Sequence, residues 1–92
     1  MEYLEVFIEH DIDSLACIFF MELDKERNQI RVVEKHKNGR IGYADLNHEV
    51  NGAFLAKEKY PTIKELNELD ECIAKIISKE KFESIWEKAI RH

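Results

Sequence analysis

The sequence predicts an α+β fold with a four- to five-stranded, mainly antiparallel sheet and two helices packed on one face, in the order β-β-β-β-α-β-α. Asn38-Gly39 stands between two segments of alternating polar and apolar residues. This predicts a β-hairpin with a type I′ turn, which needs positive φ at both central residues. Thr62 and Ser78 each stand where a helix N-cap is expected, ahead of apolar residues at helical spacing. The length predicts a single domain over residues 1–92.

Residues 3–10 and 15–23 predict the first two strands. Leu4, Val6 and Ile8 share one face of the first strand, opposite polar and aromatic residues, as in a half-buried strand. The second strand is apolar on both faces, and we therefore expect it near the centre of the sheet.

The hairpin that follows comprises strands over residues 29–37 and 40–46. Gly42, inside its second strand, predicts a bulge or the close approach of another group, since glycine is otherwise unfavourable there. Residues 47–60 show no clear period and are interpreted as a loop. The loop residues expected to pack on the core are Val50, Phe54 and Leu55.

Thr62 begins the first predicted helix, because a glutamate three residues later completes a capping box. Residues 71–77 alternate like an edge strand, but they also fit one helix that continues from Thr62. We favour the strand, because a helix of roughly 30 residues is unusual in so small a domain. Ser78 then caps a last helix over residues 79–91, whose apolar stripe includes Trp86 and is interpreted as core.

The composition predicts a globular protein of the cytoplasm. The hydrophobic content is 45% and the net charge is −5. No apolar run approaches the ~20 residues that cross a bilayer, and the acidic N-terminus is unlike a signal peptide. Cys17 and Cys72 lie among apolar residues without a C-x-x-C spacing, so we expect two buried free thiols.

Charge is distributed unevenly along the chain. Residues 1–24 contain seven acidic residues and no Lys or Arg, whereas residues 25–43 contain six basic residues and two acidic ones. We favour ion pairing between acidic strands and a basic hairpin beside them. The alternative is a pair of opposed binding patches.

The sequence resembles a family of small bacterial domains of unknown function, over most of its length. The motifs that carry the resemblance are His10 at the end of the first strand, E-L-D-x-x-R at 22–27, R-x-V-E at 31–34, G-R-x-G-Y-A at 39–44 and I-S-x-E-x-F-E-x-x-W at 77–86. Ile8 departs from the pattern, since members often carry tryptophan there. The family has no assigned activity. In size and charge the chain is also similar to immunity proteins, which neutralise bacterial toxins.

Two groups of residues could support chemistry, and neither predicts an enzyme. His10, Asp11 and Asp13 offer metal-ligating atoms, but neighbouring side chains on a turn diverge and more oxygen ligands would be needed, so a solvated turn is expected. His36 and His48 would suit a metal-free acid–base pair with Lys37 or Arg40 on phosphate, yet nothing in the sequence brings them together. No cofactor or metal is expected.

A protein-interaction surface is the preferred functional prediction. Two short helices cover one sheet face well, which would leave an apolar strip with a charged rim on the other face, unless residues 47–60 fold over it. The residues predicted to bind a protein partner, such as a toxin, are Tyr3, Glu5, Phe7, Glu9, Asp11, Asp13 and Phe20. An edge strand or this face could also pair two copies into a homodimer.

The alternative is a nucleic-acid-binding or regulatory module that uses the basic hairpin. Its residues would be Lys35, Lys37, Arg40 and Tyr43, with phosphate contacts from the cations and stacking from the tyrosine. The acidic total charge weighs against this alternative.

Overall fold

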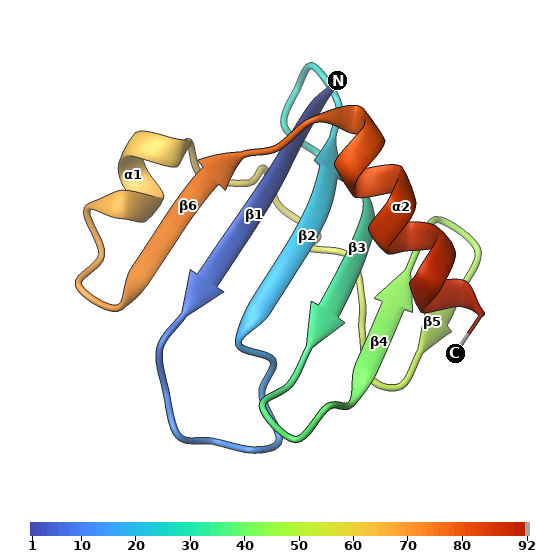
Figure 1. Cartoon of the computed structure of the whole chain (residues 1–92). Helices are drawn as coiled ribbons and strands as arrows, with labels where there is room; N and C mark the ends of the chain where they lie inside the picture. Colours follow the sequence, from blue (N-terminus) through green and yellow to red (C-terminus); the bar gives the residue numbers. More distant parts are fainter. Residues whose placement is uncertain (92) are drawn as a thin grey trace.

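A computed structural model of the chain describes residues 1–91, which form an α+β fold around one antiparallel sheet (Figure 1). The strands lie in the order β5-β4-β3-β2-β1-β6, and every neighbouring pair is antiparallel. The elements are β1 (Glu2–Ile8), β2 (Ile18–Leu23), β3 (Gln29–Lys35), β4 (Ile41–Ala44), β5 (Glu49–Val50), α1 (Ile63–Asn67), β6 (Cys72–Ile76) and α2 (Lys79–Ile90). The predicted class is confirmed. The sheet has six strands because two residues of the predicted loop, β5, also pair with β4.

Strands β2 and β3 lie at the centre of the sheet, as the apolar character of the second strand predicted. The alternation in β1 is also confirmed, because Leu4 and Val6 belong to one buried cluster and Tyr3 belongs to another. The first cluster lies on the side of the sheet covered by α1, here called the α1 face. The second lies on the side covered by α2, the α2 face.

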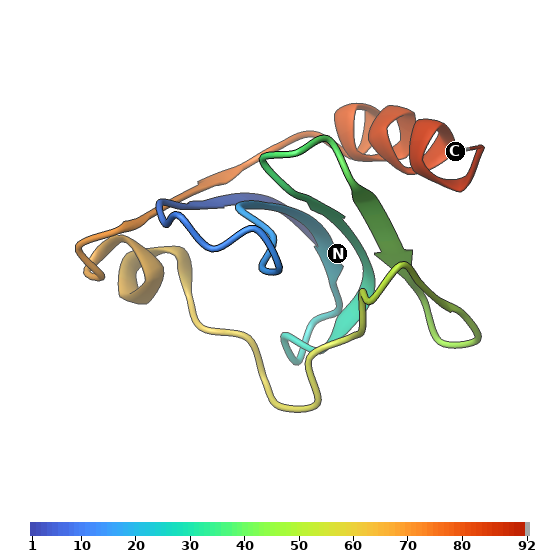
Figure 2. The same cartoon turned by 90° about the horizontal axis from the view of Figure 1, so that it is seen from below.

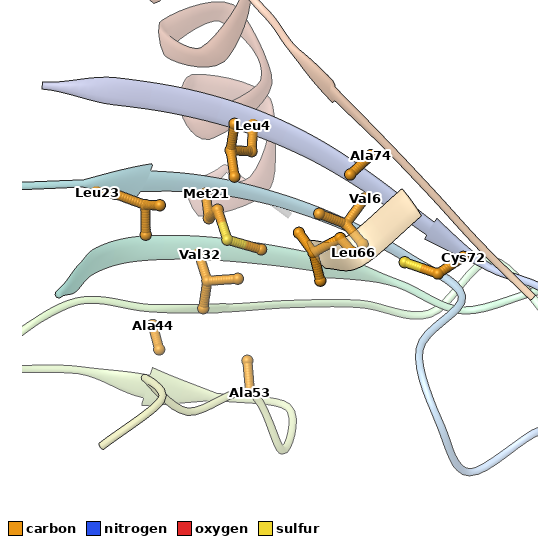
Figure 3. Packing of buried hydrophobic residues seen from close by; sticks show 10 residues of the cluster. All are labelled: Leu4, Val6, Met21, Leu23, Val32, Ala44, Ala53, Leu66, Cys72 and Ala74. Atoms are coloured by element: carbon orange, nitrogen blue, oxygen red, sulfur yellow. The ribbon is translucent and has the colours of Figure 1, made fainter. Parts of the chain in front are cut away.

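The two helices lie on opposite faces of the sheet, so the prediction that both pack on one face is wrong (Figure 2). The physical reason is that the central strands are apolar on both sides and each side needs a cover. On the α1 face, Leu66 of the short helix and Ala53 complete a core with Leu4, Met21 and Val32 (Figure 3).

On the α2 face, Phe82 of the helix is fully buried against Tyr3, Phe20 and Val33. Trp86 is partly buried in the same cluster, as predicted, and packs edge-on against Tyr43 with the ring centroids 5.4 Å apart.

The predicted hairpin is present, but its turn differs from the predicted type I′. Of the two central residues, only Gly39 has positive φ, at 90°. His36 N–H donates to the Arg40 carbonyl, so the loop has three residues and resembles a type I turn followed by a glycine bulge. The Asn38 side chain accepts from Arg40 N–H at 2.9 Å, which holds this shape.

Gly42 confirms the predicted close approach. A Cβ atom at this position would lie 2.8 Å from the carbonyl oxygen of Val50 and 3.1 Å from the Cβ of Ala53. Both residues belong to the chain that folds back over β4, so the missing side chain allows this part of the molecule to close.

Both predicted helix caps are confirmed. Strand β6 separates the two helices, so the chain does not continue from Thr62 as one long helix. Thr62 and Glu65 form a complete capping box, and the Ser78 hydroxyl accepts from Lys81 N–H. Neither helix in residues 1–91 combines the length and the apolar character that crossing a membrane requires. Both cysteines are buried free thiols, as predicted.

The side chain of Asn67 closes the outer edge of β6. Its amide nitrogen donates to the Ala74 carbonyl at 3.0 Å, and its amide oxygen accepts from Ala74 N–H at 2.7 Å. The amide therefore replaces the next strand at this point of the edge.

The acidic and basic segments neutralise one another, as the preferred interpretation of the charge pattern predicted. Ion pairs join Glu2 to Arg27 at 2.8 Å and Asp11 to Lys37 at 3.0 Å. Arg31 binds Glu22 at 2.7 Å on the neighbouring strand and also Glu83 at 2.8 Å on α2.

Candidate binding pocket

A pocket of about 420 Å³ lies on the α1 face, beneath the chain that links β5 to α1. We call residues 51–62 of this link the crossing segment; it passes across the sheet in Figure 2. The floor comes from β1, β2 and β3, and includes Ile8, Phe19 and Val32. Residues 14–16, in the loop between β1 and β2, form another wall. The volume of the pocket is in the range of small-molecule and side-chain binding sites.

Three side chains fasten the crossing segment to the sheet by hydrogen bonds to its backbone. Arg27 donates to the carbonyl oxygens of residues 60 and 61, at 2.9 and 2.6 Å. Gln29 accepts from the N–H of residue 56 at 2.8 Å, and Arg40 donates to the carbonyl of residue 51 at 2.7 Å. The segment thus stands over the pocket without pairing as a strand along its length.

The imidazole of His10 holds the loop between β1 and β2. Its Nε2 lies 2.8 Å from the carbonyl oxygen of Ala16, which can only accept, and its Nδ1 accepts from the N–H of Ile12 at 3.1 Å. Both nitrogens are therefore used, in the neutral tautomer with the proton on Nε2.

His36 is buried at the end of β3, and its Nδ1 lies 3.1 Å from the carbonyl oxygen of Asp13. The carbonyl can only accept, so Nδ1 carries a proton. In the neutral ring, Nε2 is then a hydrogen-bond acceptor. Because His36 lines the pocket, this acceptor belongs to its polar part.

Glu34 places a carboxyl group among these mostly apolar walls. Burial raises the pKa of this carboxyl, although the backbone N–H of Phe54 and the nearby His36 act in the opposite direction. Within residues 1–91 the Glu34 side chain forms no ion pair, unlike Glu22 on the other face. Perturbed carboxyl groups in a pocket are typical of functional sites.

Tyr60 lines the pocket near the end of the crossing segment. Burial raises the pKa of its phenol to about 12, so the phenol is protonated at neutral pH.

Two apolar side chains at the mouth of the pocket are exposed. Leu15 is 53% exposed and Phe54 is 63% exposed. The prediction that Phe54 packs on the core is therefore wrong, whereas Leu55 does pack there and Val50 is partly buried in β5. An exposed apolar rim around an apolar pocket is typical of a binding site.

The sequence model of a protein family, DUF6881, described as a domain of unknown function, matches residues 2–91. The chain belongs to the DUF6881 family. No curated protein and no solved structure matches the chain.

In this DUF6881 domain, the sheet face predicted to be open is covered by α2. Tyr3 and Phe20 are buried beneath the helix, so they cannot form the exposed aromatic surface that the sequence suggested. Phe7 is half-buried, and Glu5 pairs with Lys75 and with a lysine of α2. The crossing segment covers the other face instead.

The three remaining predicted partner-binding residues lie in the loop between β1 and β2. Glu9, Asp11 and Asp13 are exposed. They neighbour the pocket wall formed by residues 14–16. The acidic part of the predicted surface therefore borders the pocket.

The basic hairpin residues of the alternative prediction have partners within the chain. The Lys35 ammonium lies 5.4 Å from the centroid of the Phe20 ring, and Tyr43 packs against the aromatic core. Lys37 pairs with an aspartate, and Arg40 is bound to the crossing segment.

The two histidines that could form an acid–base pair are not brought together. His48 is bound to Asp45 at 3.0 Å in an exposed turn, and His36 lines the pocket. For the metal hypothesis, the His10 ring is engaged with the loop backbone and Asp11 with Lys37. In the described part of the chain, no group of three or more His, Cys, Asp or Glu side chains is arranged for a metal ion.

Glu34 and His36 were not predicted as a site. The available signal was the two-residue period of β3, which places both on the same face as the buried Val32. A glutamate on the buried face of a central strand is itself unusual, and it indicates either an ion pair or a functional group.

Proposed function

We propose that this protein is a non-enzymatic interaction domain that binds a protein partner at the pocket. The observation that supports this proposal is the combination of an apolar pocket with two exposed apolar side chains, Leu15 and Phe54, at its mouth. Side chains of this kind form the centre of protein interfaces, where they become buried on binding.

The surroundings of the pocket favour a basic partner. Glu9, Asp11 and Asp13 are exposed on the adjacent loop, where Asp11 pairs with Lys37, and the chain carries a net charge of −5. Acidic groups around an apolar centre accelerate association with a basic protein and orient it. The finer form of the proposal is an immunity protein whose partner is a basic toxin.

A matched pair of variants tests the proposal. Leu15→Ala with Phe54→Ala removes the rim of the pocket, and Ile73→Ala with Ile76→Ala removes two side chains of similar exposure on β6. Tagged wild-type protein should retain a partner from native lysate, identified by mass spectrometry. The β6 control should retain the same partner, and the pocket variant should lose it. Equal retention by both variants would contradict a pocket-centred interface.

The toxin hypothesis has its own test. Where the gene immediately upstream encodes a toxin, co-expression of the wild-type domain should restore growth, and the pocket variant should not. Killing that the wild-type domain leaves unchanged would contradict this finer proposal and leave the interaction proposal standing.

A further inference from the structure

Glu34 is a half-buried carboxylate that lacks a cationic partner within residues 1–91. Removing a carboxylate from water is unfavourable unless a cation or hydrogen-bond donors replace the lost solvation. Glu22 shows the usual solution on the opposite face, where Arg31 and the Tyr3 hydroxyl bind it. At Glu34, the corresponding cation is missing from the described chain.

Several polar groups of the pocket wall spend donors on other partners within the described chain. Gln29 donates to the sulfur of Met21, Asn51 donates to the Ile41 carbonyl, and Arg40 donates to the crossing segment. His10 donates to the adjacent loop.

The donors near Glu34 are uncharged: the backbone N–H of Phe54 donates to its carboxylate, and the hydroxyl groups of Ser14 and Tyr60 line the pocket. The carboxylate of Glu34 has several lone pairs, and Nε2 of His36 is an acceptor whenever the ring is neutral, since its Nδ1 faces the Asp13 carbonyl. What Glu34 lacks within the described chain is a cationic partner, so a ligand that brings a charged donor complements the site most effectively.

We propose that the pocket binds a Lys or Arg side chain of the protein partner, with its methylene stem along Phe19 and Val32 and its charged head on the Glu34 carboxylate. This inference depends on the proposed function, because it assumes that a protein supplies the side chain. Long cationic side chains suit such a site, since their stems are apolar while their heads are charged. The exposed acidic residues of the neighbouring loop would favour the same partner electrostatically.

Three small probes of equal chain length test the charge preference: n-pentylamine, 1-pentanol and pentanoate. In a two-dimensional NMR titration of the ¹⁵N-labelled full chain at neutral pH, n-pentylamine should shift the amide signals of Glu34, His36 and Phe54. It should bind about tenfold more tightly than 1-pentanol, since a charge-assisted hydrogen bond replaces a neutral one. Pentanoate should bind most weakly.

Glu34→Gln keeps the shape of the side chain and removes its charge. It should reduce the affinity for n-pentylamine about tenfold, to that of 1-pentanol, and leave 1-pentanol binding unchanged. Glu80→Gln removes the same charge from an exposed position in the first turn of α2 and should change neither affinity. Tighter binding of pentanoate or of 1-pentanol in the wild type, or an unchanged amine affinity in Glu34→Gln, would overturn the proposal.

The same variants separate this inference from the proposed function. If Leu15→Ala with Phe54→Ala loses the partner while Glu34→Gln retains it fully, the interface stands and the cation site is wrong. If n-pentylamine binds at Glu34 while partner retention is indifferent to the pocket rim, the cation preference stands and the proposed interface is wrong.

Discussion

Replacement of Arg31 by methionine tests how far the attachment of α2 depends on one side chain. Arg31 binds Glu22 on β2 at 2.7 Å and holds both carboxylate oxygens of Glu83 on α2, at 3.0 and 2.8 Å. Its guanidinium also lies 4.9 Å from the ring centroid of Phe82 and 5.2 Å from that of Trp86. Methionine keeps much of the packing volume and removes the charge and every donor.

The largest expected loss comes from Glu22, whose side chain is 9% exposed. Breaking a fully buried pair costs about 3–5 kcal/mol, but the Tyr3 hydroxyl still donates to Glu22, so we expect about 2 kcal/mol here. Glu83 is 39% exposed, and solvent screening limits its share to about 0.5–1 kcal/mol. The lost cation–π contacts add about 0.5–1 kcal/mol. The variant should therefore lose about 3–4 kcal/mol, a large part of the ~5–15 kcal/mol typical of a domain.

Urea unfolding followed by Trp86 fluorescence measures this loss. With a slope of about 1–1.5 kcal/mol per molar urea, the midpoint should fall by about 2–4 M. Double-mutant cycles with Glu22→Gln and Glu83→Gln should give the larger coupling energy for Glu22. A total loss below about 1 kcal/mol, or a larger coupling to Glu83, would refute this reasoning. The stability of Arg31→Lys should fall between those of the wild type and Arg31→Met, because lysine keeps the charge but cannot bind both oxygens of Glu83.

The pH dependence of the same variants provides a second measurement. Hydrogen bonding to Arg31 lowers the pKa of Glu83 in the folded state. The resulting stability is present above the ordinary glutamate pKa and is lost as the pH falls through the lower folded-state value. Arg31→Met should lose the part of the stability that depends on the ionisation of Glu83. A stability that falls with pH as in the wild type would contradict the bond between Arg31 and Glu83 as its cause.

Three further predictions concern other parts of the sheet. Gly42→Ala should lower the free energy of unfolding by about 1–3 kcal/mol, because its Cβ would meet the Val50 carbonyl; a change below about 0.5 kcal/mol in urea unfolding would contradict the close approach. Burial raises the folded-state pKa of Glu34, so its penalty appears as the pH rises above the ordinary glutamate pKa. In thermal unfolding, Glu34→Gln should therefore gain more stability relative to the wild type at pH 7 than at pH 3. An equal change relative to the wild type at both pH values would contradict the raised pKa. Asn67→Ala should cost about 1–2 kcal/mol by removing both bonds to Ala74, and it should promote association through the uncovered edge. Size-exclusion chromatography at several concentrations should show this association, and a strictly monomeric variant would contradict the edge-protection role.

Local signals in the sequence were sufficient for most of the elements. The Thr62 and Ser78 caps, the alternation in β1 and the close approach at Gly42 all depend on residues a few positions apart or on a single residue, and all are confirmed. The turn type was wrong because Asn-Gly suits both two- and three-residue loops. The bond from Arg40 N–H to the Asn38 side chain favours the three-residue loop.

The arrangement of the helices and the pocket depend on contacts between distant residues. Arg27 and Gln29 hold residues about 30 positions away, and no local pattern predicts such bonds. Without them, the crossing segment could not be placed on the α1 face, and α2 could not be assigned to the opposite one. The carboxyl of Glu34 then had no recognisable surroundings in the sequence.

The crossing segment has a consequence for the motions of the domain. It is held by side-chain bonds from residues 27, 29 and 40, by a backbone bond from Tyr60 to Arg27, and by packing of Ala53 and Leu55 on the core. None of these contacts belongs to the ladder between β1, β2 and β3, so the segment can detach while that ladder stays intact. We therefore expect amide hydrogens of residues 53–60 to exchange with solvent faster than those of the central strands. A ligand in the pocket would contact both the sheet and the crossing segment and would slow that exchange. The exchange rate of the segment should therefore report whether the pocket is occupied.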